Sequence, residues 1–161
     1  SIPQSMASTS DYEAQLRDAA TLVVDRAHGR HDGAWDLVFQ SRSGPPQVPW
    51  LEPDVVDHLE ALAADGVSDV VLVPIGFLSD HVEVLFDLDV QAAEAAAALG
   101  LGLRRVETVG THPTFVAGLA DLVEELTAGA APKALGPLGP REWPCRPDCC
   151  PAPARPGRPR P

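Results

Sequence analysis

The sequence lacks any run of 18 apolar residues, and residues 1–4 carry neither a basic flank nor an apolar stretch. A bilayer-spanning helix needs about 20 apolar residues and a secretory signal needs both of the missing N-terminal features, so we expect neither. The prediction is a cytoplasmic protein without stable membrane insertion. With 161 residues, 45% of them apolar, the chain is long enough for one compact domain.

Positive charge and methionine are both scarce. The chain has 12 Lys and Arg against 23 Asp and Glu, which gives a formal net charge of −11. Such a surface repels phosphate backbones and anionic lipid, so nucleic acid is not an expected partner. Met6 is the single methionine, and the chain opens on Ser1. We therefore expect the sequence to be a piece of a longer protein.

The C-terminal region has few side chains to bury in a core. Residues 132–161 hold 10 of the 17 prolines and, apart from Leu135 and Leu138, almost no aliphatic side chains. Because frequent proline blocks helix formation, we expect a folded body over residues 1–131 and an extended or disordered tail over residues 132–161.

All three cysteines, Cys145, Cys149 and Cys150, lie in this tail. Cytoplasmic thiols rarely form disulfides, and thiols grouped in a segment without a core indicate a clip for a metal or a cluster. An accidental grouping of the three thiols is the alternative.

The body alternates helix and strand patterns. Apolar residues at helical spacing predict helices over residues 10–28, 53–65, 80–99 and 113–126. Short apolar runs predict strands over residues 36–40, 69–75 and 103–109, the middle run being typical of a strand covered on both faces. This order is typical of a doubly wound parallel α/β sheet, which normally begins with a strand. We therefore expect the first strand to be missing before Ser1.

A polar helix face comes after the middle strand. In a sheet of this kind ligands bind beyond the carboxyl ends of the strands, near residues 40–50, 75–81 and 109–113 here. Glu83, Asp87 and Gln91 lie at intervals of four residues, which places them on one face of a regular helix. A divalent cation between two carboxylates relieves their repulsion, so the pattern predicts a track for a hard cation. A solvated helix face is the alternative.

The same segment resembles a known family. Residues 74–89 read Pro-Ile-Gly-Phe-Leu-Ser-Asp-His-Val-Glu-Val-Leu-Phe-Asp-Leu-Asp and closely resemble the signature helix of ferrochelatases. The resemblance covers residues 1 to about 128, including residues 38–45 and 49–51. Residues 1–3 resemble the Ser-Ile-Pro that comes directly after the active-site histidine in the family's Ala-His-Ser-Ile-Pro stretch. The tail resembles the extension of actinobacterial members, which act on coproporphyrin III.

The resemblance implies an enzyme of heme biosynthesis that inserts ferrous iron into a porphyrin bound between two Rossmann-like halves. This chain would be the C-terminal half, with porphyrin, ferrous iron and the missing N-terminal half as partners. Glu83 would be the catalytic carboxylate and a metal ligand, paired across the porphyrin with a histidine just before Ser1. Asp87 would be the next metal ligand along the path, where Gln91 stands in place of a usually acidic residue.

Several residues near this path have two interpretations. Trp50 and Phe77 could pack on the macrocycle or anchor their loops. His81 could hydrogen-bond within the cleft or pack as a structural residue, and on a regular helix it would point away from Glu83. Asp80 could cap the helix or take part in catalysis.

The resemblance also bears on the cysteines. It implies that Cys145, Cys149 and Cys150 hold a 2Fe–2S cluster together with a fourth cysteine from the missing half. Zinc or no metal is the alternative. For the whole protein, the alternative to a chelatase is a non-catalytic domain that stores or passes a metal cation.

Overall fold

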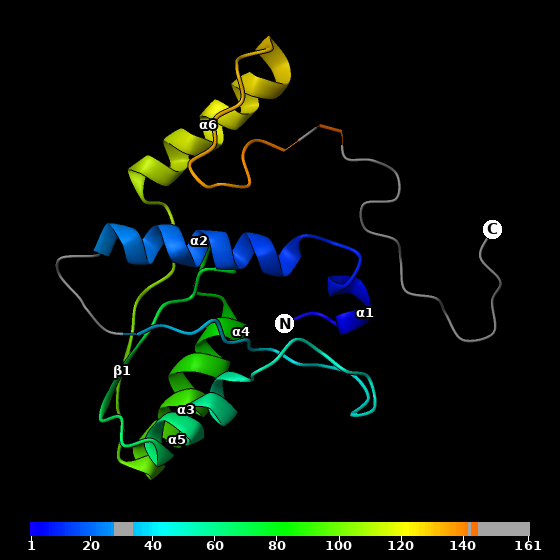
Figure 1. Cartoon of the computed structure of the whole chain (residues 1–161). Coiled ribbons are helices and arrows are strands. Elements are labelled where there is room, and N and C mark those ends of the chain that lie inside the picture. The colour runs from blue at the N-terminus through cyan, green and yellow to red at the C-terminus, as the bar shows by residue number, and fades with distance from the viewer. Residues whose placement is uncertain (28–33, 142, 145–161) are drawn as a thin grey trace.

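The computed structural model describes residues 1–27, 34–141 and 143–144 (Figure 1). Its helices are α1 (Gln4–Ala7), α2 (Tyr12–Ala27), α3 (Val55–Ala64), α4 (Val82–Val84), the π-helix η1 (Leu85–Ala92), α5 (Ala93–Leu99) and α6 (Pro113–Ala128). Its strands are β1 (Asp69–Leu72) and β2 (Gly102–Arg105). No helix in these ranges is long and apolar enough to cross a membrane.

The buried core lies between the two-stranded sheet and two helical elements, α3 before β1 and the rod of α4, η1 and α5 between β1 and β2. Helix α3, the α4–η1–α5 rod and the loop after the rod supply the buried apolar side chains, namely Val55, Leu59, Val84, Leu88, Ala92, Ala96 and Leu101. Val70, Leu72 and Leu103 of the sheet pack against this cluster. The core therefore fixes the rod, which carries the acidic residues, against β1 and β2.

The two strands form a parallel sheet, with Asp69 opposite Gly102 and Leu72 opposite Arg105. Only one face of this sheet is covered by the described residues. Val71 is 58% exposed and Val73 is 42% exposed, because α3, η1 and α5 all pack on the side of Val70. The expectation of a strand covered on both faces is thus wrong for this part of the chain.

The four predicted helices are confirmed. The helices predicted over residues 10–28, 53–65, 80–99 and 113–126 correspond to α2, α3, the α4–η1–α5 rod and α6, with the observed bounds given above, and residue 28 lies outside the described residues. The rod ends at Gly100, whose φ of 74° is the left-handed conformation that favours glycine. Asp54 is the N-cap of α3 and accepts a hydrogen bond from Val56 N at 2.9 Å.

The predicted strand over residues 36–40 is wrong. Phe39 makes a single parallel bridge to Asp54. Its N–H donates to Pro53 O at 2.9 Å and its carbonyl accepts from Val55 N at 2.8 Å. The backbone of Phe39 therefore pairs with the start of α3 and not with a neighbouring strand. The strands predicted over 69–75 and 103–109 are present as the shorter β1 and β2.

The start of the tail contacts the body without helix or strand structure over residues 132–141. Lys133 N donates to Glu125 Oε1 at 2.9 Å, Lys133 Nζ pairs with Asp121 at 2.9 Å, and Arg141 pairs with Asp11 at 2.9 Å. The three cysteines lie outside the described residues. The doubly wound order, the missing first strand and the division at residue 131 remain predictions.

Candidate active site

A cavity of about 200 Å³ lies where the loop after Phe39 meets α3 and the π-helix η1. The polar side chains that line it are those of Gln40, Ser41, Arg42, Asp54, Asp87 and Gln91. Two of the three residues on the predicted acidic face, Asp87 and Gln91, therefore face one cavity. Glu83 is not among the residues that line it.

Asp87 is held in place by the loop opposite. Ser41 Oγ donates to Asp87 Oδ2 at 2.5 Å, and Gln40 Nε2 donates to the same oxygen at 3.3 Å. Both of these hydrogen bonds use Oδ2, so Oδ1 is the oxygen available to a cation. Charge-assisted hydrogen bonds of this kind fix the orientation of a carboxylate.

Ser41 adopts an unusual backbone conformation. Its φ is 66°, in the left-handed region, and it is the one non-glycine residue with positive φ in the described chain. A non-glycine residue in this region costs roughly 1–3 kcal/mol and persists only where its surroundings hold it. Such strain is concentrated at functional sites, and here it accompanies the contact between Ser41 Oγ and Asp87.

The Ser1 ammonium lies within electrostatic reach of three carboxylates. Burial lowers the pKa of this ammonium, while the negative charges of Glu83, Asp54 and Asp87 act to raise the same pKa. The ammonium donates to Gln40 O at 2.5 Å. Glu83 is exposed in the first turn of α4. Ser1, Glu83 and Asp87 thus share one region of the molecule.

The π-helix changes the regular spacing that the sequence pattern assumes. In η1 the backbone bonds run from residue i to i+5, so side chains four residues apart do not stack as they do in an α-helix. Asp87 and Gln91 lie within η1, whereas Glu83 lies before it in α4. Within the described ranges, no three His, Cys, Asp or Glu side chains come together to hold a metal ion. The metal roles of Glu83 and Asp87 remain predictions.

His81 caps the rod. Its backbone is extended, with φ −82° and ψ 172°, and its Nδ1 accepts a hydrogen bond from Val84 N at 3.4 Å. The expectation that treated His81 as part of a regular helix is therefore wrong. Its ring packs edge-on against Phe77, with 4.7 Å between ring centroids, and Phe77 packs against the core. A structural role accounts for these contacts of both residues, and porphyrin binding by either remains a prediction.

Trp50 joins its loop to the N-terminal segment. Its backbone forms an antiparallel bridge with Pro3, and the next residue, Leu51, donates to Ile2 O at 3.0 Å. The indole Nε1 is buried and has no hydrogen-bond partner in the described part of the chain. These contacts fit the anchoring interpretation, and contact with a macrocycle remains a prediction.

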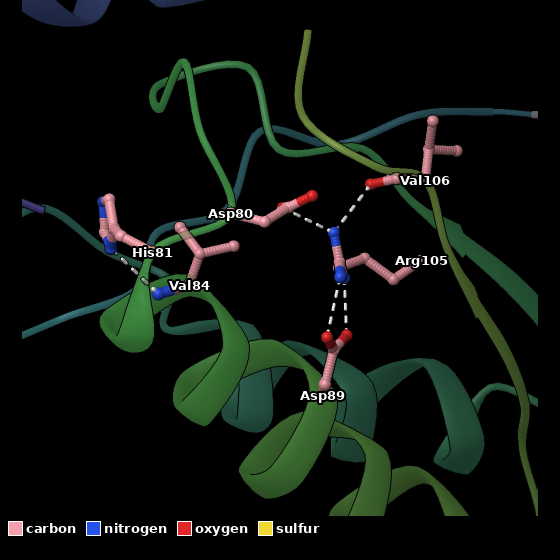
Figure 2. A network of polar contacts seen from close by, with 6 residues as sticks. All are labelled: Asp80, His81, Val84, Asp89, Arg105 and Val106. Carbon is pink, nitrogen blue, oxygen red and sulfur yellow. Dashed lines mark hydrogen bonds and ion pairs between the residues drawn. The ribbon is translucent and has the colours of Figure 1, made fainter. Parts of the chain in front are cut away.

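Asp80 does not cap the helix, since His81 is the N-cap of α4, and the Asp80 carboxylate binds Arg105 instead. Figure 2 shows Arg105 between Asp80 and Asp89. Arg105 Nη1 donates to Asp80 Oδ1 at 2.8 Å, while Nε and Nη2 donate to the two oxygens of Asp89 at 2.5 and 2.7 Å. These hydrogen bonds hold the pKa of Asp89 below its ordinary value and raise the pKa of Arg105.

Three residues with clear structural roles were not identified from the sequence, namely Gln40, Ser41 and Arg105. The loop over residues 40–50 was expected on the ligand side, which was the available signal for Gln40 and Ser41. No pattern singles out Arg105, because its partners lie 16 and 25 residues away in the chain.

Comparisons with known proteins agree with the sequence resemblance. The family model described as Ferrochelatase matches residues 1–127. The chain belongs to the ferrochelatase family. It is 52% identical to the coproporphyrin III ferrochelatase of Streptomyces griseus, over 88% of this chain and 40% of that protein. It is 50% identical to a ferrochelatase of Rhodopirellula baltica, over 93% of this chain and 42% of that protein. The chain thus spans about two fifths of the length of these relatives.

Proposed function

We propose that the complete protein inserts ferrous iron into a porphyrin and that this chain supplies the C-terminal part of the enzyme. Membership of the ferrochelatase family supports the reaction class. The observation that carries the assignment to this site is the grouping of Glu83 and Asp87 with Ser1 and the loop of Gln40 and Ser41.

The reaction needs groups that remove protons and strip water from the metal. Two pyrrole protons must leave the porphyrin as Fe²⁺ enters, and a carboxylate within reach of them is a suitable general base. Glu83 is exposed and can take that role. Asp87, with Oδ2 held by Ser41 and Gln40, offers Oδ1 to the incoming cation. Gln91 adds no charge, so metal binding beyond Asp87 is weak.

A histidine directly before Ser1 completes the proposed site. The Ser1 nitrogen feels the charges of Glu83 and Asp87, so a residue joined to that nitrogen would lie beside the same carboxylates. An imidazole there would share metal delivery and proton removal with Glu83. The proposal also includes a strand before Ser1 in a doubly wound sheet, because an α/β unit of this order normally begins with a strand.

Coproporphyrin III is the proposed substrate, since relatives in Streptomyces griseus and Propionibacterium freudenreichii carry that substrate in their names. The experiment is an anaerobic insertion assay of the complete protein with Fe²⁺ and either coproporphyrin III or protoporphyrin IX. We expect a higher kcat/KM for coproporphyrin III. Metal binding with no insertion into either porphyrin would contradict the proposal and favour a non-catalytic metal-binding domain.

A 2Fe–2S cluster on Cys145, Cys149 and Cys150 is a further part of the proposal. Three thiolates suit iron–sulfur chemistry, but the chain has three cysteines and the cluster needs four ligands, so the fourth must come from outside this chain. The cluster would stabilise the tail and takes no part in the proposed proton transfer. Iron and acid-labile sulfide in the purified complete protein would support it, and zinc or no metal would contradict it.

A further inference from the structure

Arg105 is an arginine at the end of β2 whose guanidinium contacts three groups. Its side chain is 13% exposed, against 28% for Asp80 and 38% for Asp89. Besides the two carboxylates it donates to Val106 O at 3.2 Å. In Figure 2 the guanidinium lies between the loop that carries Asp80 and the helix that carries Asp89. An ion pair this shielded is less screened by solvent than a surface pair.

The two carboxylates flank the residues of the proposed site. Asp80 immediately precedes the cap of α4, and Asp89 lies in the middle of η1. Glu83 and Asp87 lie between them in the sequence. A single side chain on the sheet therefore ties both ends of the segment that carries Glu83 and Asp87.

The geometry uses features that only arginine has. The planar guanidinium binds both oxygens of Asp89 in parallel, and its remaining nitrogen reaches Asp80. A lysine ammonium keeps the charge but has no fork, so it cannot make the paired contact to Asp89 and also reach Asp80 in this way.

We propose that Arg105 is a positioning residue that sets where the π-helix η1 lies relative to the sheet, and so sets where Glu83 and Asp87 stand. The π-helix needs such a restraint because its widened turns depart from the favoured α-helical ladder. The catalytic consequence rests on the proposed function, whereas the restraint on η1 does not.

The test compares Arg105→Lys with Arg26→Lys in the complete protein. Arg26 is exposed in the last turn of α2, away from the sheet, so the two variants make the same chemical change with and without the loss of the contacts to Asp80 and Asp89. For Arg105→Lys we expect kcat for iron insertion to fall about tenfold or more, with the KM for porphyrin within about twofold of wild type. Arg26→Lys retains wild-type kcat.

Hydrogen exchange provides a second measurement that needs no catalysis. In Arg105→Lys the amides of η1 exchange faster than in wild type, while those of α3 do not. Asp89→Asn removes the paired carboxylate and leaves the Asp80 contact. If Arg105→Lys does not fold, Asp89→Asn replaces it in the test, and we expect the same exchange pattern from it.

The outcomes distinguish the positioning role of Arg105 from the proposed function. Equal kcat values in Arg105→Lys and Arg26→Lys, or unchanged exchange of η1 in Arg105→Lys, would overturn the positioning role. An inactive wild-type protein would refute the proposed function alone, because hydrogen exchange of η1 still measures the restraint that Arg105 places on this helix.

Discussion

The carboxylate of Asp89 links stability to pH. Hydrogen bonds from Arg105 hold its pKa below the ordinary value for an aspartate. A carboxyl group with a lowered pKa stabilises the folded protein above its unfolded-state pKa, and that stabilisation is lost as the pH falls through the folded-state pKa. Asp89→Asn should therefore reduce the free energy of unfolding by about 1 kcal/mol at pH 7, after allowance for partial exposure, and by less at about pH 3, where the unfolded chain is mostly protonated at this position.

Urea unfolding of the complete protein at both pH values measures this difference. Glu107→Gln serves as the control, because Glu107 is exposed and makes no hydrogen bond or ion pair with the rest of the described chain. If Asp89→Asn lowers the free energy of unfolding by the same amount at both pH values, the proposed dependence of stability on the protonation of Asp89 is contradicted.

Asp87 and Gln91 test the cation path. Asp87→Asn removes the charge that Ser41 and Gln40 orient, so the KM for Fe²⁺ should rise and kcat should fall. Gln91→Glu adds a carboxylate to the same cavity and should tighten cation binding. Steady-state kinetics with varied Fe²⁺ measure both effects. If neither substitution changes the kinetics, this surface is a solvated helix face.

At the scale of residues, the four-residue spacing predicted that Glu83, Asp87 and Gln91 share one helix face. Asp87 and Gln91 line the cavity and Glu83 does not, and the catalytic and metal roles remain predictions. The contact between Ser41 and Asp87 could not be predicted, since it joins residues 46 apart in the chain and depends on a left-handed backbone at Ser41. Spacing patterns report local periodicity and carry no information on such pairings.

At the scale of elements, helices were predicted better than strands. Helical spacing spans many residues, and the rod from Val82 to Leu99 was predicted as one element. Its π-helical turns were not predicted, because apolar spacing does not distinguish i+4 from i+5 hydrogen bonding. The run over residues 36–40 looks like a buried strand because Phe39 is buried, but its backbone partners belong to the start of α3.

Leu88 tests how the π-helix is held by the core. Leu88 is 2% exposed and Leu85 is 40% exposed, and both lie in η1. Leu88→Ala should lower the free energy of unfolding by about 2–5 kcal/mol, through lost burial and a cavity, whereas Leu85→Ala should cost far less. Thermal or urea unfolding compares the two variants. Equal losses would show that η1 does not pack as described.

At the scale of the molecule, much apolar surface remains exposed. Figure 1 shows α6 on the opposite side of α2 from α3 and α5. Five apolar residues of α6 are 44–58% exposed, namely Val116, Leu119, Leu122, Val123 and Leu126. Val71 and Val73 beside β1 are also exposed, and apolar side chains left exposed in this way promote aggregation.

Residues 1–161 expressed alone should therefore aggregate and should show no iron insertion. Extending the chain upstream of Ser1 should restore a cooperative melt and activity if, as proposed, the added chain covers apolar surface and supplies the histidine. Light scattering, thermal melting and the insertion assay on both lengths measure this. A soluble short chain with a sharp transition and full activity would refute the expected division of the enzyme.

The central claim is that Glu83 belongs to the iron-insertion site, and one substitution tests it most directly. Glu83→Gln in the complete protein keeps the shape of the side chain and removes its basicity, with Glu94→Gln on the exposed surface of α5 as the control. The measurement is the rate of iron insertion into coproporphyrin III together with porphyrin binding by fluorescence quenching. We predict that Glu83→Gln lowers insertion by at least about a hundredfold while porphyrin binding stays near wild type and Glu94→Gln stays active. Near-normal insertion by Glu83→Gln would contradict the account.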